Sequence, residues 1–95
     1  MIRVVIKGNI DNITIKGHAN YDEYGKDIVC ASVSTMYITT INAILRIDCD
    51  AIEYDDEHIK VLKQNETVNK LLENLVDLLQ ELEKQYPKYI EIRRC

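Results

Sequence analysis

Hydrophobic and polar residues alternate at the start of the chain, which is the pattern of a β-strand with one buried face. Residues 2–7 show the alternation first, and residues 13–16 repeat it. Between them, Gly8 and its polar neighbours favour a turn. The pattern therefore predicts a β-hairpin that ends at Gly17.

Two longer segments carry hydrophobic residues at helical spacing. The first runs from residue 28 to about residue 46, and the second covers residues 68–82. Many β-branched residues weaken the intrinsic helix propensity of the first segment, so burial has to help stabilise it. Asp27 suits the N-cap position of the first helix, and either Asn65 or Thr67 suits that of the second.

Shorter segments with strand character lie on both sides of the second helix. Residues 51–54 and 59–62 flank the acidic turn 55–57 and predict a second hairpin, and residues 89–92 predict a last strand. The predicted order is strand, strand, helix, strand, strand, helix, strand. We interpret the 95 residues as one α+β domain in which two helices pack on a mainly antiparallel sheet.

Composition is typical of a globular chain, with 46% hydrophobic and 29% charged residues. The net charge of −4 argues against direct nucleic-acid binding that depends on neutralising phosphates. We expect no apolar run as long as the roughly 20 residues that are needed to span a bilayer. We also expect no secretion signal before the first strand. We therefore expect a cytoplasmic protein without membrane contact.

The chain has three cysteines, Cys30, Cys49 and Cys95, and none of them forms a CxxC pair. An odd number at this spacing fits neither a complete disulfide framework nor a zinc site. Reduced thiols are the better interpretation.

A histidine and a cysteine stand at opposite ends of the polar stretch between the first hairpin and the first helix. His18 follows the predicted hairpin, and Cys30 is the predicted N3 residue of the helix if Asp27 is the N-cap. Aligned backbone N–H groups at a helix start favour a thiolate over a thiol. A general base and an activated nucleophile could therefore meet here.

Each of these residues also has a simpler interpretation that the pattern leaves open. Cys30 could be a small buried residue, and His18 a surface residue near a turn. Asp27 could serve only as a cap. Helical spacing places Asp27, Cys30 and Ser34 on one stripe that can line a cleft, although a helical serine often bonds to the carbonyl four residues back.

The polar stretch itself is expected to be a mobile loop over residues 19–26. Gly25 supports that interpretation because glycine adapts to many backbone conformations. Tyr21 and Tyr24 could cover a bound peptide when such a loop closes, or they could be ordinary loop aromatics facing solvent.

Two short sequence elements, with a glycine between them, resemble a family signature. The first is Gly17-His18-Ala19-Asn20, the glycine is Gly25, and the second is Asp-Ile-Val-Cys-Ala-Ser-Val-Ser at residues 27–34. In this order and spacing they are hard to obtain by chance. They resemble the signature of the ribosomal-processing cysteine protease Prp family, also called YsxB-like, and the chain length and element order agree with that family.

The resemblance implies a cytoplasmic bacterial endopeptidase that removes a short N-terminal extension from large-subunit ribosomal protein L twenty-seven. It implies Cys30 as the nucleophile and His18 as the general base, with Asp27 and Ser34 supporting substrate binding or site geometry. It also implies a homodimer that needs no metal or organic cofactor. Family members often have Ala-Leu after the motif serine, whereas Thr35-Met36-Tyr37 stands here, which could alter the dimer or the cleft wall.

Two other classes of function stay open on the sequence. A non-catalytic ribosome-associated binding module would keep the fold but would not need the Cys30 thiol. A thiol redox-responsive protein would use Cys30 without hydrolysing a peptide. Peptide cleavage separates the three hypotheses.

Overall fold

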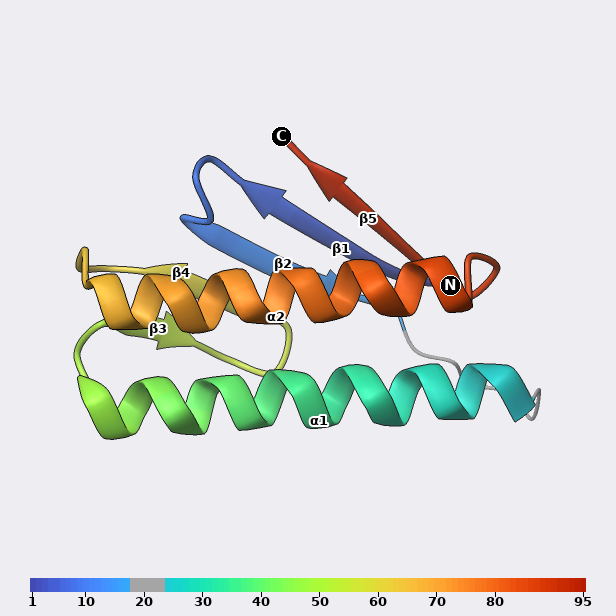
Figure 1. Cartoon of the computed structure of the whole chain (residues 1–95), viewed down its shortest axis with the longest axis horizontal. Helices are drawn as coiled ribbons and strands as arrows, with labels where there is room; N and C mark the ends of the chain where they lie inside the picture. The colour runs from blue at the N-terminus through green and yellow to red at the C-terminus, as the bar shows by residue number, and fades with distance from the viewer. Residues whose placement is uncertain (18–23) are drawn as a thin grey trace.

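The structure is a computed structural model that describes residues 1–17 and 24–95. Within these residues the elements follow the predicted order (Figure 1). They are β1 (Ile2–Lys7), β2 (Asn12–Lys16), α1 (Tyr24–Ile47), β3 (Ile52–Tyr54), β4 (His58–Val61), α2 (Glu66–Gln85) and β5 (Ile90–Arg94). The predicted class, two helices on a mainly antiparallel sheet, is confirmed.

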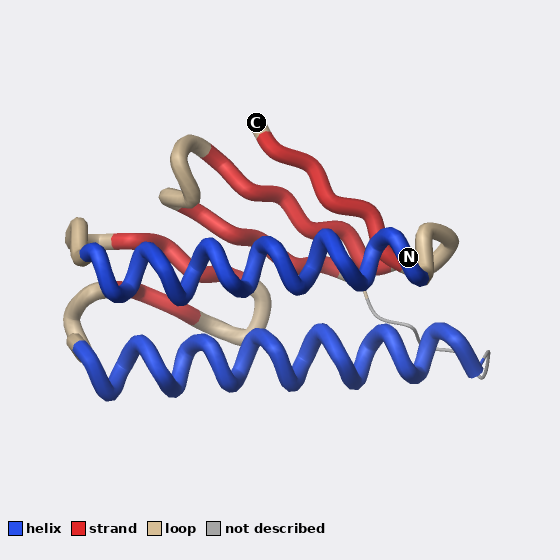
Figure 2. The backbone as a smooth tube through the Cα atoms, in the orientation of Figure 1, coloured by secondary structure: helices blue, strands red, loops and turns tan. Residues whose placement is uncertain are grey.

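The five strands form one sheet in the order β3-β4-β2-β1-β5. The pairs β3–β4, β4–β2 and β2–β1 are antiparallel, whereas β5 pairs with β1 in parallel. A parallel pair needs a crossover connection, and α2 carries the chain back to supply it. The two helices lie side by side over the sheet (Figure 2).

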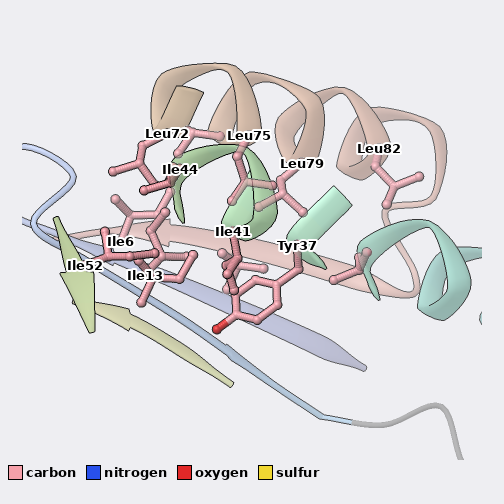
Figure 3. Close-up of a cluster of buried hydrophobic side chains, with 14 of the residues drawn as sticks. Ile6, Ile13, Tyr37, Ile41, Ile44, Ile52, Leu72, Leu75, Leu79 and Leu82 are labelled. Atoms are coloured by element: carbon pink, nitrogen blue, oxygen red, sulfur yellow. The ribbon is translucent and has the colours of Figure 1, made fainter. Parts of the chain in front are cut away.

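One face of the sheet and one stripe of each helix form a common hydrophobic core. In β1, Ile2, Val4 and Ile6 are buried, while Arg3 between them and Lys7 after them are exposed. The buried residues of α1 are Val29, Val33, Tyr37, Ile41 and Ile44. Figure 3 shows several of these side chains meeting the leucines of α2 above the strands. This packing fixes how α1 is rotated over the sheet.

Helix α2 begins after a well-formed cap. The Asn65 side chain accepts hydrogen bonds from the N–H groups of Thr67 and Val68, at 2.9 and 3.2 Å. Asn65 is therefore the N-cap, and the alternative that Thr67 caps the helix is wrong. Pro87 stands just after the C-cap residue Tyr86, where it does not interrupt the helix.

Helix α1 begins earlier than the sequence predicted. It starts at Tyr24 rather than Ile28, so Asp27 is the fourth helical residue and is not the N-cap. Cys30 is the seventh residue of the helix and lies in its second turn, not at position N3. The effect of the helix dipole falls off within the first turn, so it contributes less to the chemistry of Cys30 than expected.

The predicted loop over residues 19–26 is likewise wrong for its last three residues. Tyr24 and Gly25 belong to the first turn of α1. Hydrophobic periodicity locates the buried stripe of a helix, but it does not report a polar first turn that precedes the stripe. Residues 18–23 lie outside the described part of the chain, and with them the predictions for His18 and Tyr21.

One stretch of α1 has the length and composition of a membrane span, contrary to the sequence prediction. Ile28–Ile47 is 20 residues long and has a mean hydropathy of 1.6. About a third of it, 33%, is buried inside the fold. Serines, threonines and one asparagine interrupt the apolar residues, but no charge does before Arg46. The absence of membrane contact stays a prediction.

Candidate active site

A cleft of about 450 Å³ opens beside α1. Its wall along the helix includes Cys30, Ser34, Ile38 and Asn42, which recur every four residues and so share one stripe. The ends of β1 and β2 and the turn between β3 and β4 supply the other walls. The predicted stripe of Cys30 and Ser34 therefore does line a cleft.

Cys30 occupies the border between the core and this cleft. Val29 before it is fully buried, Ala31 after it is exposed, and Cys30 itself is half-buried against the core. Its thiol is free, as are those of Cys49 and Cys95, which are both exposed. Of the three thiols, only that of Cys30 lies in the lining of the cleft.

The strand side of the cleft ends at Gly17, the residue directly before His18. Gly17 has a φ of 98°, a conformation that L side chains rarely adopt. A Cβ atom added there would collide with the backbone carbonyl oxygen of Met1. The positive φ and the collision are two separate reasons why glycine is needed at the end of β2, in the lining of the cleft that also contains Cys30.

The turn between β3 and β4, residues 55–57, consists of three acidic residues that line the cleft. The Asp55 carboxylate accepts a hydrogen bond from the N–H of Glu57 at 2.8 Å, which is a typical way for aspartate to stabilise a turn. Among the side chains that the structure describes, those of residues 1–17 and 28–95, no three from His, Cys, Asp or Glu form a group that could hold a metal ion.

Tyr37 is a cleft residue that the sequence indicated only as part of the departure Thr35-Met36-Tyr37, which could alter the dimer or the cleft wall. It is 6% exposed, and its hydroxyl donates to the backbone oxygen of Asp55 at 2.8 Å. Burial, with a further contribution from the negative charge of Asp55, raises the pKa of Tyr37 well above its ordinary value. The hydroxyl therefore stays protonated and can donate a hydrogen bond. The hydrogen bond itself had one further signal in the sequence, because a buried tyrosine needs a partner for its hydroxyl.

A family model that describes the cysteine protease Prp matches residues 1–91. The protein whose cleft holds Cys30 is therefore of the cysteine protease class. The family is that of Prp, and the chain belongs to it. The resemblance found in the sequence is thereby confirmed.

Similar proteins of Staphylococcus aureus agree with this assignment. The ribosomal processing cysteine protease Prp of strain Mu50 is 33% identical over 98 residues, covering 96% of this chain and 92% of the relative. A crystal structure of the essential S. aureus Prp with a substrate peptide has a TM-score of 0.88, with 30% identity and full coverage of both chains. A second, with a covalently linked product peptide, has a TM-score of 0.85, 31% identity and the same coverage.

We predict that Gly17→Ala lowers the free energy of unfolding by at least about 1–2 kcal/mol, because it combines an unfavourable φ with a collision against rigid backbone. Gly8→Ala is the matched control. Gly8 also has a positive φ, 63°, but the added Cβ would meet only the flexible end of the Asp11 side chain. Urea denaturation measures both, and equal losses would contradict the close approach to Met1.

Proposed function

We propose that this chain is a cysteine endopeptidase that removes the short N-terminal extension of large-subunit ribosomal protein L twenty-seven and so supports ribosome maturation. The observation that carries the proposal is the free, half-buried Cys30 in the wall of an apolar cleft, in a chain of the Prp family. The S. aureus relatives are named as ribosomal processing proteases, one with a substrate peptide and one with a covalently linked product peptide. The first name agrees with recognition of a peptide substrate, and the second agrees with a covalent step.

In this proposal Cys30 is the nucleophile and His18 is the general base. His18 follows Gly17 directly in the chain, and Gly17 lines the same cleft as Cys30. This proximity supports a Cys-His dyad. No metal or organic cofactor takes part in the proposed reaction.

The chemistry follows from these two groups. His18 removes the proton of the Cys30 thiol, and the thiolate attacks the scissile carbonyl carbon to form a tetrahedral intermediate. The protonated imidazole gives its proton to the leaving amine as the C–N bond breaks, which leaves a thioester. Water, deprotonated by His18, then hydrolyses the thioester and restores the thiol.

The oxyanion of the tetrahedral intermediate needs donors other than the N–H of Cys30. In an α-helix the first four N–H groups have no intrahelical acceptor, whereas later ones do. Cys30 is the seventh residue of α1, so its own N–H is engaged within the helix. The N–H groups of the first turn are the candidates that α1 offers.

Five further residues are proposed to support substrate binding or the geometry of the site: Ser34, Asp27, Gly25, Tyr21 and Tyr24. Ser34 is exposed in the cleft wall one helical turn after Cys30, so its hydroxyl is available to a peptide. The others lie in the first turn of α1 or before it, on the chain segment that connects the proposed base to the proposed nucleophile.

We predict that Cys30→Ala and His18→Ala each abolish processing of the extended ribosomal protein. Each substitution removes one partner of acyl transfer while leaving the fold intact. Cys49→Ala and Cys95→Ala are the matched controls, because both thiols are exposed and lie outside the cleft lining, and they should retain activity. Intact-mass spectrometry of the ribosomal protein measures the trimming.

Circular dichroism shows whether each variant is folded. A folded Cys30→Ala variant that processes at the wild-type rate would rule out cysteine catalysis. A wild-type protein that binds the substrate without trimming it would instead favour the binding-module hypothesis.

A second prediction concerns selectivity. The walls contributed by Ile2, Ile15 and Val33 are apolar, so the cleft should accept a short extended segment with apolar or aromatic side chains. Unfolded casein offered at the same concentration should be cleaved at a small fraction of the rate of the ribosomal protein. Comparable rates on a gel time course would show that the enzyme digests unfolded chains without preference.

We also propose that the protein is a homodimer in the cytoplasm. The family resemblance is what suggests the dimer. Sedimentation equilibrium at micromolar concentrations should give twice the chain mass of 11.0 kDa. A mass that stays at 11.0 kDa would exclude the dimer without affecting the protease assignment.

A further inference from the structure

Tyr37 links two walls of the cleft that are far apart in the sequence. Its ring is buried in the core beside Ile41, and Figure 3 shows its hydroxyl oxygen pointing away from α2. That hydroxyl donates to the backbone oxygen of Asp55, 18 positions along the chain, at 2.8 Å. The bond therefore ties α1 to the turn 55–57.

The turn 55–57 is closed by hydrogen bonds of its own and is also bonded to β2. The N–H of Asp55 donates to the oxygen of His58 at 3.0 Å, and the Asp55 carboxylate accepts from Glu57 at 2.8 Å. The N–H of Ile15 in β2 donates to the oxygen of Glu57 at 2.7 Å. Because these hydrogen bonds hold the turn together, it moves as a unit. The Tyr37 hydrogen bond therefore helps to fix the distance between the turn and α1.

The position of Tyr37 defines the distance from the nucleophile to this turn. Cys30 and Tyr37 are seven residues apart on α1, which is a rise of about 10 Å. An extended peptide advances about 3.3 Å per residue, so about three substrate residues cover that distance. Ile15 and Val33 line the same cleft, and Ile41 lines it one helical turn beyond Tyr37.

We propose that Tyr37 is a positioning residue that determines substrate specificity. By holding the turn 55–57, it shapes a pocket for one large apolar or aromatic side chain of the substrate, about three residues from the scissile bond. This inference rests on the proposed protease function and adds to it the position of one recognised side chain and the residue that shapes its pocket.

Removing the Tyr37 hydroxyl should loosen one wall of the pocket without creating a cavity in the hydrophobic core. In Tyr37→Phe the ring stays in place, but the hydrogen bond between α1 and the turn is lost. A large substrate side chain gains less binding free energy in a pocket with a mobile wall than in a pocket with a fixed wall, because the mobile wall has to be ordered on binding. The loss should therefore depend on one substrate position and not on the others.

A double-mutant cycle between enzyme and peptide tests this dependence. In a peptide spanning the cleavage site, each residue within five positions of the scissile bond is replaced by alanine in turn. For the wild type, alanine at one apolar position about three residues from the bond should lower kcat/KM at least tenfold. For Tyr37→Phe the same replacement should lower it about two- to threefold, and every other replacement should have equal effects on the two enzymes.

Tyr89→Phe is the matched control, because Tyr89 is a half-buried tyrosine outside the cleft lining, and it should behave like the wild type. Thermal unfolding of each variant monitors stability. An equal penalty for Tyr37→Phe and the wild type at every peptide position would overturn the inference. So would a uniform loss of activity that follows the unfolding temperature.

Peptide affinity separates this inference from the proposed catalytic chemistry. Dissociation constants of the same peptides are measured in the Cys30→Ala background with and without Tyr37→Phe, where no cleavage is required. Coupling between Tyr37 and one peptide position supports the inference even if Cys30 proves not to be the nucleophile. Binding that is equal in the two backgrounds for every peptide would overturn it even if cleavage depends on Cys30.

Discussion

The burial of one stripe of α1 against the sheet and α2 is the interaction on which the rest of the structure depends. Val29 and Val33 belong to this stripe and are 0% and 5% exposed. Burying a side chain of this size contributes about 1.5–3 kcal/mol, so the helix cannot rotate without a large loss. Cys30 and Ser34 each follow one of these valines in the sequence. Core packing therefore determines which residues face the cleft.

Helix α1 packs against the hydrophobic core on one side and lines the cleft on the other. The core stripe is apolar, and the cleft stripe, which includes Ser34 and Ile38, is uncharged. Together they leave 18 residues, Ile28 to Leu45, without a charge. The composition that resembles a membrane span follows from this double role of α1, because a helix with two uncharged stripes has little room for charged residues.

Features with a local period were predictable from the sequence, whereas features set by distant contacts were not. Alternation in β1 and the leucines of α2 predicted the element order, and Asn65 was recognised as one of two caps. The first turn of α1 carries no apolar period, so its start at Tyr24 was missed. The parallel pairing of β5 with β1 and the Tyr37–Asp55 hydrogen bond depend on tertiary packing, which no local pattern reports. For the site, helical spacing placed Cys30 with Ser34 in a cleft wall, but nothing local indicated that the acidic turn 55–57 lines the same cleft.

Trapping the covalent intermediate would test the central claim, that Cys30 accepts the acyl group, most directly. Enzyme and extended substrate are mixed at equal concentration, quenched in acid within the first turnover, digested with a second protease and mapped by mass spectrometry. We expect a thioester adduct, with the mass of the removed extension, on the peptide that contains Cys30. An adduct on a peptide that contains Cys49 or Cys95 instead would contradict the assignment of the nucleophile.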